Sequence, residues 1–180
     1  MQTIQEGYSD RCKFGFGTPY LPEVPEDVLL EMREVAERHN LRIDMHMAES
    51  RGEIQEIKKQ HGCDGSIEYL DRLGLLSPRL IATHCVHVSP KEIELIRKRG
   101  VGVAHCPASN AKLGDGVAPL TTFLKAKIPV GLGTDGPATN NCIDLFQEMK
   151  LACLLQRAVH CDPMVVKAED ALKMATMGGA

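Results

Sequence analysis

Short apolar runs alternate with longer amphipathic segments along the chain. Runs rich in aliphatic residues and glycine predict strands at 13–17, 41–45, 79–83, 101–104 and 128–133. Between and after them, apolar residues recur at helical spacing. This spacing predicts helices at 26–39, 51–60, 66–73, 90–99, 119–126, 143–159 and 168–177.

The helix expected at 90–99 has the clearest end signals. Ser89 stands where an N-cap belongs, Pro90 takes the first helical position, and Glu92 follows three residues after the serine as a capping-box partner. Gly100 then ends the helix.

Five strand-then-helix units with short connections are typical of one α/β domain. Such alternation predicts parallel strands, right-handed crossovers and helices packed outside the sheet. The strands are short and apolar, as expected when both faces of a sheet are covered. The whole chain, 1–180, is therefore interpreted as one domain.

Composition narrows the classes of partner. The chain has 180 residues, a net charge of −3 and no basic patch, which argues against nucleic acid or an anionic membrane surface as its partner. Its apolar runs fall short of the roughly 20 residues that a membrane helix needs, and its polar N-terminus resembles no signal peptide. Seven scattered cysteines without a Cys-x-x-Cys pair favour a reduced, cytoplasmic setting.

Chemically capable residues come at the ends of the predicted strands. His46, His84, His105 and Asp135 each follow an apolar run, and Glu49 comes three residues after His46. In parallel α/β folds the carboxyl ends of the strands share one face, and active sites are built there. We therefore expect these side chains to converge.

Two imidazoles and a carboxylate on one face suit zinc or iron(II). Each residue alone has a simpler interpretation: a histidine after a strand as a hydrogen-bonded residue, Asp135 as a turn aspartate before Gly-Pro, and Glu49 as a solvated helix residue. Their shared position on separate strands favours His46, His84 and Asp135 as metal ligands.

Other residues near the same face are interpreted structurally. His87 is expected to line or cap the rim, and His105 to shape the pocket, with ligation as the alternative. Cys85 and Cys106 are expected to be small buried residues rather than ligands.

Four linked motifs resemble the amidohydrolase superfamily, most closely the 5-methylthioadenosine/S-adenosylhomocysteine deaminases and related chlorohydrolases. The motifs are HMAE at 46–49, ATHCVH at 82–87, VAHCPASNAKLG at 103–114 and GTDGPATNN at 133–141. The resemblance runs in order through nearly the whole chain.

The resemblance implies a (β/α)8 TIM-type barrel, of which this chain supplies about strands 4 to 8, with zinc, or alternatively iron(II), at its centre. His46 would be a ligand on the fifth strand and His84 would lie near or on the metal, contacting the attacking water. Asp135 would be the ligand after the eighth strand and orient that water, and Glu49 would be the proton shuttle. The implied activity is hydrolytic deamination of an adenine-type nucleoside.

Two departures from the family pattern keep alternatives open. The chain contains no His-x-His pair, which the family uses for two further ligands, and Gly17 stands where the family has a substrate-binding histidine. A triazine or other aminated heterocycle is therefore an alternative small-molecule substrate, and a non-catalytic barrel fragment is a second alternative. We also expect either a homo-oligomer or a missing N-terminal half, because strands 4 to 8 alone leave open sheet edges.

Overall fold

A parallel sheet forms the centre of the structure, a computed structural model that describes residues 14–18 and 20–179. Its strands pair in chain order, and each pair is parallel. They are β1 (Gly15–Thr18), β2 (Arg42–Met47), β3 (Leu80–His84), β4 (Gly102–His105) and β5 (Val130–Leu132). The predicted α/β class is confirmed.

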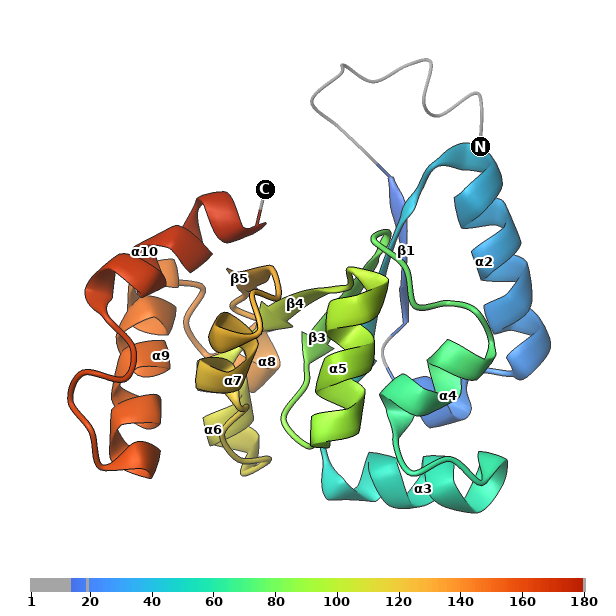
Figure 1. Cartoon of the computed structure of the whole chain (residues 1–180). Coiled ribbons are helices and arrows are strands. Elements are labelled where there is room, and N and C mark those ends of the chain that lie inside the picture. Colours follow the sequence, from blue (N-terminus) through green and yellow to red (C-terminus); the bar gives the residue numbers. More distant parts are fainter. Residues whose placement is uncertain (1–13, 19, 180) are drawn as a thin grey trace.

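Helices connect successive strands and flank the sheet (Figure 1). The helices before β4 are α2 (Glu26–His39), α3 (Arg51–His61), α4 (Ser66–Arg72) and α5 (Pro90–Arg99), with the 3-10 turn η1 (Leu21–Glu23) ahead of them. The later ones are α6 (Pro107–Leu113), α7 (Leu120–Lys125), α8 (Pro137–Asn140), α9 (Leu145–His160) and α10 (Ala168–Ala175), followed by η2 (Met177–Gly179). In Figure 1, α2 lies at one end of the arrangement and α9 and α10 lie at the other.

The end signals expected for α5 are present. Ser89 accepts a hydrogen bond from the Glu92 amide, the Glu92 carboxylate accepts one from the Ser89 amide, and Gly100 adopts a left-handed conformation with φ of 68°. These contacts satisfy amide and carbonyl groups that a helix end otherwise leaves unpaired. The predicted capping box is therefore confirmed.

The apolar positions of the helices and strands pack together as one core. Side chains from helices on both halves of the chain are fully buried against the strands, and they include Leu29, Ile57, Leu70, Ile96 and Phe123. Burying each such side chain stabilises the fold by roughly 1.5–3 kcal/mol. This core fixes the strand ends relative to one another.

Several predicted bounds were wrong, and two short helices were missed. The strand predicted at 41–45 extends to Met47, so His46 lies inside β2, and the strand predicted at 128–133 is shortened to Val130–Leu132. Helices α6 and α8 each begin with a proline, after β4 and β5 respectively, in segments where no helix was predicted. The first predicted strand begins at Lys13, which lies outside the described residues.

The two edges of the sheet differ in their surroundings. Within the described residues β1 pairs only with β2. At the other edge η2 lies close against β5. The approach leaves no room for a side chain on Gly178, since a Cβ built there would come within 2.3 Å of the Val130 carbonyl oxygen. Among the described helices, none combines the length and apolar character that crossing a bilayer requires.

Candidate metal centre

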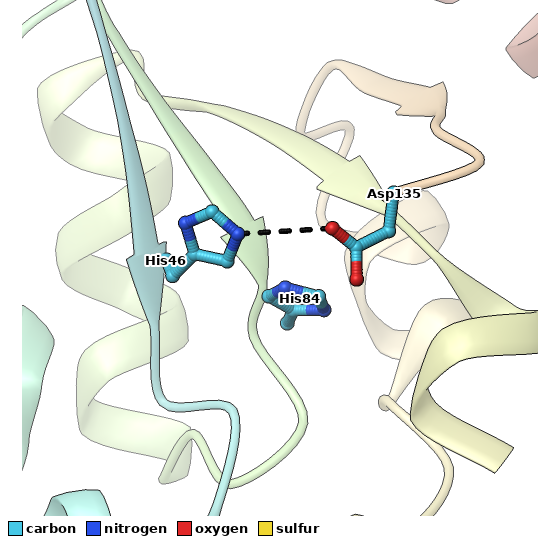
Figure 2. A group of neighbouring side chains, drawn as sticks. All are labelled: His46, His84 and Asp135. Atoms are coloured by element: carbon cyan, nitrogen blue, oxygen red, sulfur yellow. Dashed lines mark ion pairs between the residues drawn. The ribbon is translucent and has the colours of Figure 1, made fainter. Parts of the chain in front are cut away.

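Three side chains from separate parts of the sheet converge at its carboxyl end. They are His46 from β2, His84 at the last position of β3 and Asp135 from the loop after β5, and each offers one ligand atom within 4.8 Å of the others. The Nε2 of His46 lies 3.8 Å from Oδ1 of Asp135 (Figure 2). The two imidazole centroids are 5.0 Å apart. The structure thus brings together the predicted ligands.

The ring of His46 is oriented by a backbone group on the neighbouring strand. Its Nδ1 lies 3.0 Å from the carbonyl oxygen of Thr18, which can only accept a hydrogen bond. Nδ1 therefore carries the proton in the neutral ring, and Nε2 keeps its lone pair on the side facing Asp135.

His84 is fully buried and is oriented in the same way by a side chain. Its Nδ1 lies 2.8 Å from Oδ1 of Asn110, so Nδ1 is the donor and Nε2 carries the lone pair. That Nε2 has no hydrogen-bond partner. A buried polar atom without a partner is unfavourable by about 1–3 kcal/mol, and a cation at this point would satisfy it.

Asp135 is fixed through one oxygen and free at the other. Ser109 and Thr139 donate hydrogen bonds to Oδ2 at 2.6 and 2.7 Å, while Oδ1 faces His46. Burial acts to raise the pKa of Asp135, but the two hydroxyls and the amide of Gly136 outweigh it and hold that pKa below its ordinary value. The side chain therefore offers an anionic oxygen that could bind a cation.

Glu49 lies beside this group rather than within it. Its Oε1 is 3.5 Å from Nε2 of His84. Burial, followed by the nearby charge of Asp115, raises the pKa of Glu49, although His84 acts in the opposite direction. A carboxyl group that holds its proton closer to neutrality can serve as a general acid.

A second carboxylate holds the backbone at Glu49. Glu53, buried in α3, accepts hydrogen bonds from the amides of Ala48 at 2.7 Å and Glu49 at 2.9 Å, and also from the hydroxyl of Ser66. Ala48 has a φ of 51°, which is unusual for a residue other than glycine. His84, Cys85 and Asp135 share this feature, with φ of 75°, 49° and 56°.

The other rim residues considered in the sequence analysis are not members of the group of candidate ligands. His105 ends β4 and is buried, and burial followed by the nearby His84 lowers its pKa to about 4. Cys85 and Cys106 are buried small residues, as predicted. Burial raises the pKa of both thiols, so neither is poised to bind as a thiolate.

Sequence reasoning missed the residues that orient the ligands. Ser109, Asn110 and Thr139 contact the ligand side chains, and Glu53 contacts the backbone next to Glu49. The signal was available in part, because these three residues lie in two of the four motifs, where Ser109 and Asn110 follow the end of β4 by four and five residues and Thr139 follows the end of β5 by seven. Their roles depend on which atoms face one another, which a residue pattern does not specify.

The donor set fits a catalytic metal centre. Two neutral imidazole nitrogens and one carboxylate oxygen are ligands that zinc accepts, and catalytic zinc sites often have three protein ligands and an open position. In each histidine the other ring nitrogen, Nδ1, donates a hydrogen bond to an oxygen that is held in place by the fold. Metal-bound imidazoles usually have such a partner.

The sequence matches one protein family and is similar to curated deaminases. Residues 2–180 match the model of the Amidohydrolase family. A 5'-deoxyadenosine deaminase of Methanothermobacter thermautotrophicus is 42% identical over 172 residues, which are 95% of this chain and 40% of that protein. A 5-methylthioadenosine/S-adenosylhomocysteine deaminase of Pelotomaculum thermopropionicum is 42% identical over 167 residues, 93% of this chain and 38% of that protein.

Solved structures share the fold. The crystal structure of an adenosine deaminase from Xanthomonas campestris with bound zinc is 34% identical with a TM-score of 0.93, covering 98% of this chain and 40% of that one. Atrazine chlorohydrolase TrzN from Arthrobacter aurescens, complexed with zinc, is 27% identical with a TM-score of 0.90, covering 99% and 41%. The chain thus spans about 40% of the length of these proteins, and the expectation of a partial barrel is confirmed.

Proposed function

The chain belongs to the amidohydrolase family, and on that basis we propose that it supplies the metal-binding and proton-transfer residues of a hydrolytic deaminase. The proposed substrate is an adenine-type nucleoside related to methylthioadenosine, S-adenosylhomocysteine or 5'-deoxyadenosine. Support for this substrate class comes from the two deaminases that are each 42% identical to the chain.

His46, His84 and Asp135 would hold the metal, and zinc is proposed over iron(II) because two similar solved structures contain zinc. A divalent cation in such a site lowers the pKa of water toward neutrality. The single observation that carries the hydrolase proposal is the placement of the two imidazoles, each with Nδ1 against an oxygen acceptor. Both donate from Nδ1 and leave Nε2 directed to the same space as Oδ1 of Asp135.

The protein's own groups would manage the protons of the reaction. Glu49 donates a proton to the ring nitrogen next to the amino-bearing carbon, which makes that carbon more electrophilic. His84 and Asp135 hold the attacking water so that its oxygen bonds to that carbon. Asp135 relays one water proton to the amine, the C–N bond breaks, and ammonia leaves. The second water proton returns to Glu49, and a ring carbonyl next to a ring N–H is left behind.

Hydrolysis of a triazine ring is the second candidate. Similarity to the atrazine chlorohydrolase supports it, and so does Gly17, because a Cβ built there would meet no atom within 4 Å. Gly17 is exposed on β1, so this position places no side chain that would restrict the substituents of a bound ring. A third possibility, a non-catalytic part of a barrel, follows from the lack of a His-x-His pair.

The proposed setting is the cytoplasm, and the proposed partner is a small heterocyclic substrate. The six cysteines of the described residues are unpaired, which supports a reducing compartment.

Metal analysis of the purified 180-residue chain tests the centre itself. We expect bound zinc after dialysis, and loss of most of it in His46→Ala and in Asp135→Asn. Equal metal content in the two variants and the unmodified chain would contradict the proposed ligands.

A chimaera tests the chemistry. The matching segment of the Pelotomaculum deaminase, 38% of that protein, is replaced by this chain, so that the host supplies the rest of the barrel. We expect ammonia release from methylthioadenosine, and at least a roughly 100-fold fall in kcat with Glu49→Gln, since general acid–base groups contribute about 10²–10⁴-fold. A panel of aminopurines, pterins, cytosine and triazines separates the nucleoside from the triazine proposal. A folded, metal-loaded chimaera that turns over none of them would favour the non-catalytic alternative.

A further inference from the structure

Three helices each direct one buried glutamate toward backbone amides of loops or helix starts. Glu53 of α3 holds the loop after β2, Glu92 of α5 binds amides at Ser89 and at Ile67, and Glu148 of α9 binds the amide of Ala108. All three glutamates are at most 3% exposed. We propose that Glu148 is the positioning residue for Asp135, a role that rests on the metal centre proposed above.

Glu148 joins two segments that are far from each other in sequence. Its Oε2 accepts a hydrogen bond from the amide of Ala108 in α6 at 3.0 Å, and its Oε1 accepts one from Nδ2 of Asn140 in α8 at 2.8 Å. The residue has no exposed surface. This buried carboxylate therefore bridges α6 and α8, which the exposed amine of Lys112 also connects through Ala138 and Asn141.

Each of the two segments carries a hydroxyl that binds Asp135. Ser109, next to Ala108, donates to Oδ2 of Asp135 at 2.6 Å, and Thr139, next to Asn140, donates to the same oxygen at 2.7 Å. Both hydroxyls sit one residue away from a contact of Glu148. Displacing Glu148 would thus move the two groups that direct Oδ1 toward His46.

A third contact runs through the backbone of the loop. Nδ2 of Asn140 also donates to the carbonyl oxygen of Thr134 at 2.6 Å, and Thr134 directly precedes Asp135. The loop places Asp135 at a φ of 56°, a conformation that needs support from its surroundings. The side-chain amide of Asn140 thus connects Glu148 to the backbone carbonyl of Thr134, directly before Asp135.

Glu92 provides a matched control. It is also a buried helix glutamate with backbone partners, accepting from the amides of Ser89 at 2.9 Å and Ile67 at 3.2 Å. None of these hydrogen bonds reaches a residue that contacts Asp135. Glu92→Gln should therefore weaken packing near α4 and α5 without altering the Asp135 loop.

Amide hydrogen exchange of the metal-free chain tests the positioning role. In Glu148→Gln one of the two donors meets an NH2 group in place of an acceptor, so we expect faster exchange at 107–110 and 134–141. Glu92→Gln should instead accelerate exchange near 66–68 and 89–93. Unchanged exchange at 134–141 in a folded Glu148→Gln chain would overturn the proposal. If that variant does not fold, Asn140→Ala is measured by the same criterion. It removes the hydrogen bonds from Asn140 to Glu148 and Thr134 and the one from Gln147, and leaves the bond between Glu148 and Ala108 in place.

Cobalt(II) titration, followed by its visible absorbance, tests the consequence for the metal. We expect Glu148→Gln to bind Co²⁺ at least about 10-fold more weakly than the unmodified chain, the usual effect of losing an outer hydrogen-bond partner, while Glu92→Gln binds within about 2-fold of it. Equal affinity in Glu148→Gln and the unmodified chain would overturn the role. An unmodified chain that takes up no Co²⁺ would contradict the metal centre instead, and hydrogen exchange would then decide alone whether Glu148 holds Asp135.

Discussion

Asn110 decides which nitrogen of His84 is available, although it is not a candidate ligand. Its Oδ1 accepts from Nδ1 of His84 at 2.8 Å, and both side chains are almost fully buried. A buried acceptor in this position fixes the tautomer, because the alternative would bring two acceptors together.

Replacing Asn110 should therefore change the ring of His84 before it changes the fold. In Asn110→Ala we expect Nδ1 to lose its partner, the free energy of unfolding to fall by about 1–3 kcal/mol, and the Nδ1–H tautomer to lose its dominance. Asn110→Asp keeps an acceptor and should preserve the tautomer. Nitrogen-15 NMR of the imidazole measures it, and an unchanged tautomer in Asn110→Ala would contradict the assignment.

Individual residues differ most in how well their roles could be predicted from the sequence. His46, His84 and Asp135 could be chosen from the sequence because parallel strands bring their carboxyl ends to one face. Ser109 and Thr139 could not, because their contribution depends on both hydroxyls reaching one oxygen of Asp135. That choice of atom is set by how α6 and α8 sit, and neither helix was predicted.

Elements of the fold were predictable where apolar spacing was long and end signals were present. Helix α2 was predicted to the residue, and the capping box of α5 was identified from Ser89 and Glu92. Helices α6 and α8 contain 7 and 4 residues, too few for a repeating apolar pattern to stand out. Helix α6 packs against α8 and α9, and Asn140 of α8 is hydrogen-bonded to Glu148 and Gln147 of α9, so their positions depend on tertiary contacts.

The contact between η2 and β5 gives an element-scale prediction. A methyl group on Gly178 would lie 2.3 Å from the Val130 carbonyl oxygen and 3.1 Å from that of Lys173, so backbone would have to move. We expect Gly178→Ala to lower the free energy of unfolding by about 1–3 kcal/mol in urea titration.

Gly52 is the control for that substitution. It lies in α3, and a methyl group at this position would have the Ser50 hydroxyl as its nearest neighbour, at 3.6 Å. Gly52→Ala should raise stability by roughly 0.5–1 kcal/mol, the helix preference of alanine over glycine. If Gly178→Ala is no less stable than the unmodified chain, η2 does not depend on this close approach to β5.

At the scale of the whole molecule, the metal should couple to unfolding. A ligand that binds only the folded chain stabilises it by about 2.7 kcal/mol at 100 times its dissociation constant, and we expect zinc to raise Tm by roughly 5–10 °C for a chain of this size. Calorimetry with and without a chelator measures the shift. Asp135→Asn should abolish it, and an equal shift in that variant would place the zinc elsewhere.

Association with another chain stays a prediction. In the described residues β1 leaves one side without a strand partner, and such edges pair readily. We expect light scattering to show a species larger than one 180-residue chain, and a stable monomer would contradict this expectation.

Four residues at the carboxyl end of the sheet hold a left-handed backbone that lowers the stability of the folded chain, and two of them are proposed for the chemistry. Ala48, His84, Cys85 and Asp135 all hold positive φ without being glycine, a conformation unfavourable by roughly 1–2 kcal/mol per residue. A library selected only for heat resistance should enrich glycine at 48 and 85, where no side-chain chemistry is proposed, and would erode His84 and Asp135 if turnover were not selected as well. Directed evolution of this chain therefore has to screen for both properties in the same round.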